Sequence, residues 1–188
     1  MPGSGKSTIA KELSTALGIK RYYIGGMRRD IAKRKGMTLE ELNKLGETDP
    51  STDKEVDNYQ VELAKREDNF IMEGRTSFFL IPNSIKIFVD VDFDEGCRRI
   101  FKELQEPSGA AKRNETGAKT LEELKRSLAA RMESDHKRYK KYYNMDNVYD
   151  RRHFDIVIDT TGCTIKQSYE KVLSAVKRAM RERASKGK

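Results

Sequence analysis

The sequence has 188 residues, of which 36% are hydrophobic and 36% charged, and its formal net charge is +8. No apolar run approaches the roughly 20 residues that a transmembrane helix needs, and two cysteines are too few for a disulfide framework. We therefore expect a single cytoplasmic domain without a membrane span. The positive charge predicts anionic ligands, but it does not decide between nucleotides and nucleic acid.

The first half of the chain is predicted to be mainly helical. Apolar residues recur at spacings of three and four over residues 6–17, and Gly18 is expected to end this helix. A short β-like run at 21–24 ends in two glycines, and helical patterns follow at 27–35, from Thr38 and at 52–65. Thr38 and Glu41 form a capping-box pattern, which predicts the start of the second of these helices.

The second half alternates apolar runs with helical patterns. The predicted strands are 69–73, 85–91 and 154–159, and the predicted helices are 121–143 and 165–184. Strands spaced in this way are typical of parallel strands joined by helical crossovers, so the pattern indicates an α/β fold. Residues 105–119 are polar and lack a period, which predicts a mobile excursion. Asp90, beside Asp92, is expected to cap the following helix rather than to bind a metal.

A phosphate-binding motif lies at the start of the chain, where residues 3–8 have the sequence Gly-Ser-Gly-Lys-Ser-Thr. With Met1 and Pro2 before them, these residues match GxxxxGK[ST] except for its first glycine. Gly3 and Gly5 let backbone N–H groups turn toward a phosphate, Lys6 neutralises the β and γ oxygens, and the Ser7 hydroxyl can bind Mg²⁺. A chance match in a flexible linker is the alternative, and the predicted strands disfavour it. The expected ATP-binding residues are Gly3, Ser4, Gly5, Lys6, Ser7 and Thr8.

The position of the motif carries a further expectation. Such a loop normally follows a hydrophobic strand and a glycine, whereas Met1 here occupies the second position of the motif. We therefore expect the first strand of the fold to be missing from this sequence, with Met1 an internal methionine of a longer loop. A parallel sheet without a central strand would leave backbone groups unpaired.

Several stretches resemble the nucleoside monophosphate kinases, in particular the cytidylate kinase-like, short-lid kinases of archaea and bacteria. The most specific stretches are 23–32, Tyr-Ile-Gly-Gly-Met-Arg-Arg-Asp-Ile-Ala, and 131–143, Arg-Met-Glu-Ser-Asp-His-Lys-Arg-Tyr-Lys-Lys-Tyr-Tyr. The resemblance covers nearly the whole chain and implies a three-layer P-loop NTPase fold with a parallel sheet. It also implies one domain over 1–188, with a helical NMP-binding insert at about 25–68 and a short lid at about 103–120.

The same resemblance implies roles for residues outside the loop. Arg29 and Arg75 would grip the acceptor phosphate, for which a bidentate guanidinium is suited, and Glu73 would hold Mg²⁺ through water. Solvated or surface-turn positions are the alternatives for these residues. Arg99 would contact ATP, and the catalytic residues Arg131 and Arg138 would lie over the transferring phosphoryl group. Arg131, Asp135 and Arg138 are spaced i, i+4 and i+7, so they share one face of the predicted helix. The alternative for this face is an ordinary ion-paired helix surface.

Base recognition is expected on the predicted helix 52–65. Cytosine presents an amino donor beside acceptors, so a carboxylate can bind it, and Asp57 is predicted to do so, ahead of Asp53 and Gln60. The residues do not separate CMP from dCMP, UMP or AMP.

The resemblance implies an enzyme that phosphorylates a nucleoside monophosphate, most of all CMP or dCMP, with ATP and Mg²⁺. A monomer is the default expectation, since the sequence does not give the oligomeric state. No covalent intermediate is required for this transfer. One alternative is a P-loop kinase for another small metabolite, and the other is a non-catalytic nucleotide- or RNA-binding module. The chain has no aromatic platform interleaved with basic residues, so nucleic acid is not the expected partner.

Overall fold

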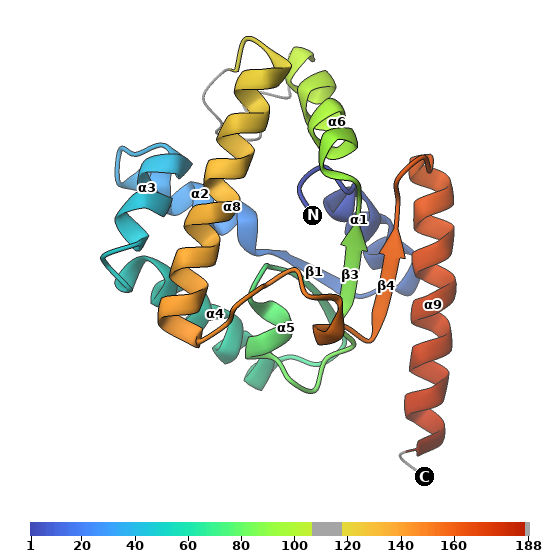
Figure 1. The fold of residues 1–188 in the computed structure, drawn as a ribbon. Helices are drawn as coiled ribbons and strands as arrows, with labels where there is room; N and C mark the ends of the chain where they lie inside the picture. The colour runs from blue at the N-terminus through green and yellow to red at the C-terminus, as the bar shows by residue number, and fades with distance from the viewer. Residues whose placement is uncertain (107–117, 187–188) are drawn as a thin grey trace.

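The structure is a computed structural model that describes residues 1–106 and 118–186, which form helices around two small parallel sheets (Figure 1). One sheet pairs β1 (Lys20–Tyr23) with β2 (Phe70–Glu73), and the other pairs β3 (Ile87–Asp90) with β4 (Ile156–Asp159). Each pair is parallel and joined through helices, so the predicted α/β class is confirmed. The single three-layer sheet remains an expectation.

The helices largely follow the predicted ranges. They are α1 (Lys6–Leu17), α2 (Ile24–Arg34), α3 (Leu39–Gly46), α4 (Ser51–Arg66), α5 (Ser77–Leu80), α6 (Phe93–Gln105), α8 (Leu121–Tyr143) and α9 (Ile165–Lys186), with a 3-10 turn η1 (Arg151–His153). Gly18 ends α1 in the left-handed conformation, with φ of 65°. Thr38 accepts from the Glu41 amide, and the Glu41 carboxylate accepts from the Thr38 amide, so the predicted capping box is confirmed.

Two local predictions were wrong. Gly25 and Gly26 lie inside α2 instead of ending the strand before it, because β1 already ends at Tyr23. Asp90 is not a helix cap: its carboxylate accepts from the Val91 amide and pairs with Arg151 at 2.5 Å. The cap of α6 is Asp92, whose side chain accepts from the Glu95 amide. Unlike Asp90, Asp92 directly precedes α6, and it lies three residues before a helical N–H group that has no partner within the helix.

The sheets share one core on α1 and α9. Ile9 of α1, Val89 of β3 and Val172 of α9 belong to one buried cluster, and α1 also contacts β1 and β2. In Figure 1, α9 lies beside β4 and extends beyond it. This packing fixes the N-terminus of α1, which carries the predicted phosphate loop, close to the ends of the strands.

The helices α2, α3 and α4 have a core of their own. Ile31 of α2, Leu42 of α3 and Val56 of α4 are buried together. A third cluster joins α6 to α8 and includes Ile100 and Leu124. α8 runs from beside α6 at its start toward α3 and α4 at its end (Figure 1), so one continuous helix links α6 to the cluster of α2, α3 and α4.

The predicted lid at about 103–120 falls mostly on residues 107–117, outside the described part of the chain. The described α6 and α8 flank that segment. Among residues 1–106 and 118–186, no helix is both long and apolar enough to span a membrane.

Candidate active site

The phosphate loop leads directly into α1. Gly3 and Gly5 have φ of 74° and 78°, in the left-handed region that side chains disfavour, and Gly5 is the N-cap of the helix. Lys6 is the first helical residue, and Ser4 is buried. Unpaired N–H groups at a helix N-terminus attract anions, so the loop has the geometry of a phosphate site.

Four predicted site residues lie close enough to Lys6 to shift its pKa. Burial lowers the pKa of Lys6 to about 8, the Glu73 carboxylate acts in the opposite direction, and Arg75, Arg131 and Arg29 lower it further. Residues from α2, β2, the turn after β2 and α8 therefore lie within electrostatic range of one ammonium group on α1. A site with four cations and one carboxylate is suited to a polyanion such as a nucleotide phosphate chain.

Glu73 lies at the end of β2 and is 3% exposed. The Arg21 Nε group donates to its Oε1 atom, while its buried Oε2 atom has no hydrogen-bond partner. The described residues contain no cluster of three or more His, Cys, Asp or Glu side chains that could hold a metal on their own. An unsatisfied carboxylate oxygen together with the Ser7 hydroxyl nevertheless fits Mg²⁺, which prefers few protein oxygens alongside phosphate and water.

Arg28 and Arg29 point in different directions. Arg29 donates to the Tyr23 hydroxyl at 2.5 Å and to the Gly25 carbonyl at 3.2 Å. Arg28 instead donates to Asn43 at 2.9 Å and to Asp53 at 3.0 Å. Since Arg29 is also the one that influences Lys6, the geometry favours Arg29 over Arg28 as the predicted phosphate-binding arginine.

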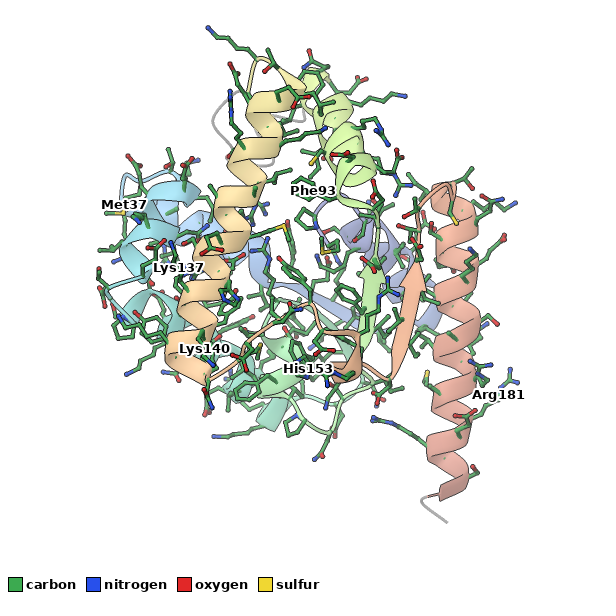
Figure 2. All side chains as sticks on the ribbon, viewed as in Figure 1. Met37, Phe93, Lys137, Lys140, His153 and Arg181 are labelled. Carbon is green, nitrogen blue, oxygen red and sulfur yellow. The ribbon has the colours of Figure 1, made fainter. Side chains whose placement is uncertain are left out.

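Arg138 lies in a buried charge cluster. It is 1% exposed and donates to the Asp53 carboxylate at 2.5 and 2.7 Å, and it also pairs with Asp135. Arg75 pairs with the same Asp135. Arg75 and Arg131 thus influence the charge of Lys6, while Arg138 is held by carboxylates of α4 and α8. Figure 2 labels Lys137 and Lys140 on α8; both are exposed, unlike Arg138.

Asp57 is engaged within the protein. Its Oδ1 atom accepts from Gln60 at 3.2 Å and Thr76 at 3.2 Å, and its Oδ2 atom accepts from the Tyr143 hydroxyl. Burial raises the pKa of Asp57, and the hydrogen bonds from Tyr143 and Thr76 act against that shift. The predicted base-binding carboxylate therefore belongs to a buried polar network in this conformation.

Arg99 belongs to α6, and its guanidinium group reaches the residues that directly follow β4. It donates to the Thr160 carbonyl at 2.9 Å and to Glu95 at 2.9 Å. The sequence reasoning missed Thr160 and also Gly96, which touches the phosphate loop: a Cβ at Gly96 would lie 2.5 Å from the Pro2 carbonyl oxygen. No local pattern marks either residue, because both act through contacts with distant segments.

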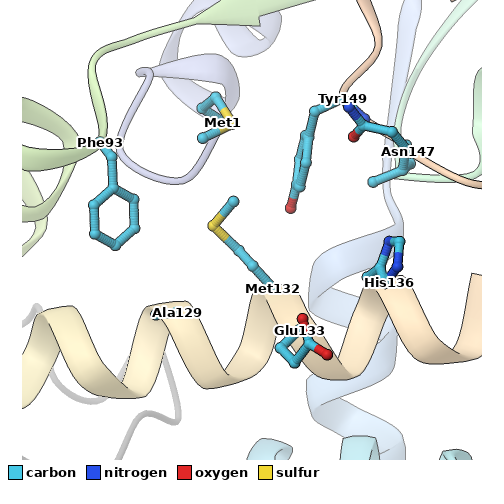
Figure 3. Close-up of a pocket in the computed structure, with 9 residues that line it drawn as sticks. Met1, Phe93, Ala129, Met132, Glu133, His136, Asn147 and Tyr149 are labelled. Carbon is cyan, nitrogen blue, oxygen red and sulfur yellow. The ribbon is translucent and has the colours of Figure 1, made fainter.

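Two cavities flank α8. One of about 380 Å³ is lined by Met1, Phe93, Met132, His136 and Tyr149 among others, and Figure 3 shows Met132 pointing toward Met1 and Tyr149. The other, of about 280 Å³, lies between α3 and α8 and includes Arg131 in its lining. Arg131 therefore both lines this cavity and influences the pKa of Lys6.

Comparison with known proteins identifies the family of this chain. The model of the cytidylate kinase-like family matches residues 1–162. The chain belongs to this family. The match includes the phosphate loop, the cluster of α2, α3 and α4, and α8, and it ends just before α9.

Curated relatives and a solved structure extend the comparison. The cytidylate kinase of Pyrococcus horikoshii is 34% identical over 181 residues, covering 96% of this chain and 84% of the relative. The cytidylate kinase of Methanothrix thermoacetophila is 36% identical over 159 residues, covering 85% and 84%. An uncharacterised Eubacterium ventriosum protein of known structure has a TM-score of 0.55 at 19% identity, covering 94% and 93%, which supports the fold alone.

Proposed function

We propose that this protein transfers the terminal phosphoryl group of ATP to a nucleoside monophosphate, preferentially CMP or dCMP. The observation that carries the proposal is the glycine loop leading into the N-terminus of α1, with Lys6 as its first helical residue. The charges of Glu73, Arg75, Arg131 and Arg29, which all influence Lys6, support it. Membership of the cytidylate kinase-like family and the names of its curated relatives support the same reaction.

On the donor side, the backbone of residues 3–8 binds the ATP phosphates and Lys6 neutralises their oxygens. Ser7 and Glu73 would hold Mg²⁺, which when bound offsets the phosphate charge. Arg99 supports this side from α6, and Arg131 faces the group in transfer from α8. Because the half-buried Lys6 lies within electrostatic range of three arginines, its positive charge is poorly compensated until an anion arrives, which favours binding of the phosphate chain.

On the acceptor side, Arg29 and Arg75 bind the monophosphate from two directions. Arg75 must then leave Asp135 or share it, since the two form an ion pair in the structure. Asp57 binds the base by exchanging one of its internal hydrogen bonds. Arg138 reaches the phosphoryl group only after releasing Asp53, so we assign its catalytic role to a rearranged, nucleotide-bound state.

The proposed fold is one domain over 1–188, with an NMP-binding insert at about 25–68 and a lid at about 103–120. Its sheet is a single three-layer parallel sheet with one further strand between β2 and β3. Within the described residues β2 pairs only with β1, and β3 pairs only with β4. The Met1 amine donates to the Val89 carbonyl of β3 at 3.0 Å. A cytoplasmic monomer completes the proposal.

The decisive experiment measures ADP release with ATP and Mg²⁺ against CMP, dCMP, UMP, AMP and dTMP. We expect turnover with CMP or dCMP to exceed turnover with the others. The chain should be compared with one extended upstream by a strand and a glycine, which we expect to be more stable. A folded, extended protein that turns over none of the five would overturn the proposal and favour a metabolite acceptor. Salt-sensitive RNA affinity without turnover would favour a binding module.

Asp57 can be tested separately through the acceptor preference. Asp57→Asn should change the ratio of kcat/KM for CMP to that for UMP, because cytosine has an amino group where uracil has a carbonyl oxygen. Glu55→Gln, an exposed carboxylate on the same helix, is the matched control and should leave the ratio unchanged. A variant that loses stability but keeps the wild-type ratio would make Asp57 a purely structural residue.

A further inference from the structure

Thr160 joins three separate segments beside the phosphate loop. It follows β4 directly and is 0% exposed. Its Oγ1 atom lies 2.8 Å from the Asp90 carbonyl oxygen and 3.3 Å from the Ser4 carbonyl oxygen, and it accepts from Nη1 of Arg99 at 3.3 Å. The end of β3, the phosphate loop and α6 therefore meet at one hydroxyl group.

Backbone contacts hold Thr160 in place independently of its hydroxyl. Its N–H group donates to the Asp90 carbonyl at 3.0 Å, and its carbonyl accepts from Nη2 of Arg99 at 2.9 Å. Arg99 is anchored in turn by Glu95, one turn earlier on α6. A change confined to the hydroxyl should thus leave the residue in position and alter only what the hydroxyl touches.

The contact with Ser4 matters because of peptide geometry. Ser4 is 2% exposed, so water cannot readily replace the partner of its carbonyl. The Ser4 carbonyl and the Gly5 N–H group belong to one planar trans peptide and point in opposite directions. With the carbonyl turned toward Thr160, the Gly5 N–H group is turned away from Thr160, and it belongs to the loop that encloses the phosphates.

We propose that Thr160 is a positioning residue for the phosphate donor: its hydroxyl fixes the Ser4–Gly5 peptide so that the Gly5 N–H group faces the phosphate chain. The inference rests on the proposed function only in taking this loop as the ATP site. A hydroxyl can share its proton between the two carbonyls while accepting from Arg99, and valine, which has the same shape, can do neither.

Two comparisons at position 160 isolate the hydroxyl group. The first compares wild-type Thr160 with Thr160→Val, which has the same shape without the hydroxyl. The second compares Thr160→Ser with Thr160→Ala, which differ in the hydroxyl on a smaller side chain. We expect loss of the hydroxyl in each pair to raise the Kd of a non-hydrolysable ATP analogue with Mg²⁺ about tenfold, equivalent to 1.4 kcal/mol. The KM for CMP should stay within twofold, and Thr160→Ser should bind the analogue nearly as the wild type does.

Titration calorimetry measures the Kd without an acceptor, and steady-state kinetics gives the two KM values. Equal ATP affinity across a folded pair, or parallel increases in the KM for ATP and CMP, would overturn the inference, since a merely structural role predicts one of these. If Thr160→Val does not fold, the Ser and Ala pair decides. Hydroxyl-dependent ATP binding without CMP turnover in the wild type would refute the proposed function and support this inference.

Discussion

Arg138 of α8 and Asp53 of α4 form a buried ion pair, with Nη1 of Arg138 at 2.5 and 2.7 Å from the two Asp53 oxygens. Arg28 of α2 donates to the same carboxylate at 3.0 Å. The Asp53 carboxylate therefore contacts two guanidinium groups from different helices, and one of them, Arg138, also pairs with Asp135. This relationship connects α8 to the cluster of α2, α3 and α4 through charge as well as through apolar packing.

Asp53→Asn should destabilise the protein strongly. The substitution leaves Arg138 and Arg28 buried with less compensation, and breaking a buried pair in this way costs about 3–5 kcal/mol of unfolding free energy. Urea denaturation at pH 7 measures the change. Glu62→Gln on the same helix is the control, because its pair with Lys65 is exposed, and such pairs contribute about 0–1 kcal/mol. Similar losses in both variants would contradict the role assigned to Asp53.

Gly96→Ala should weaken ATP binding, although glycine-to-alanine changes within helices usually stabilise them. The expected gain from helix propensity is about 1 kcal/mol. Here the new Cβ would lie 2.5 Å from the Pro2 carbonyl oxygen, a backbone atom, so α6 or the loop must move. We expect a lower melting temperature and a higher Kd for ATP, with Lys102→Ala, an exposed position of α6, as the control. A more stable Gly96→Ala variant with unchanged ATP affinity would show that the loop accommodates the methyl group.

Lys6→Met should abolish turnover and yet stabilise the protein. Burial lowers the pKa of Lys6 to about 8 from 10.5, so between these pH values the folded state binds fewer protons than the unfolded state. The free energy of unfolding of the wild type should therefore rise with pH across this window, by up to about 3 kcal/mol from Lys6. Lys6→Met should lack this rise, whereas Lys11→Met, exposed on the same helix, should keep it. Parallel pH profiles for wild type and Lys6→Met would refute the burial of the charge.

Tyr143→Phe should cost more stability at pH 7 than at pH 4. The Tyr143 hydroxyl donates to Asp57, and burial raises the pKa of Asp57. Just above the usual pKa of Asp, the folded state therefore binds more protons than the unfolded state. Removing the donor raises the pKa of Asp57 further, which lowers stability as pH rises through that window. At pH 7 we expect a loss of about 1–3 kcal/mol. Denaturation curves at both pH values test this, and an equal loss at pH 4 and 7 would mean that Asp57 is not the affected group.

Local signals predicted local structure well. The spacing of apolar residues predicted α1 and α8 with their observed ends, and Thr38 with Glu41 predicted the start of α3, because these features depend on neighbours within one turn. The motif of residues 3–8 likewise predicted a loop that ends in a helix N-terminus.

Contacts between distant segments could not be predicted in this way. The pairing of Arg138 with Asp53 joins residues 85 apart in the sequence, and the Thr160 hydroxyl meets a carbonyl 156 residues away. Charge periodicity on α8 showed that Arg131, Asp135 and Arg138 share a face. It did not show that Arg138 lies buried against Asp53 of α4, or that Asp135 lies buried against Arg75. The assignment of Asp90 as a cap failed for a smaller reason, since two aspartates compete for one helix start.

The continuity of α8 has a thermodynamic consequence. A helix of 23 residues is about 35 Å long, and this one packs against both α6 and α3. If the proposed nucleotides bind on these two sides, a tilt of α8 caused by one of them would change the contacts offered to the other. Linkage then makes the effect reciprocal: the factor by which ATP alters the affinity for the monophosphate equals the factor by which the monophosphate alters the affinity for ATP.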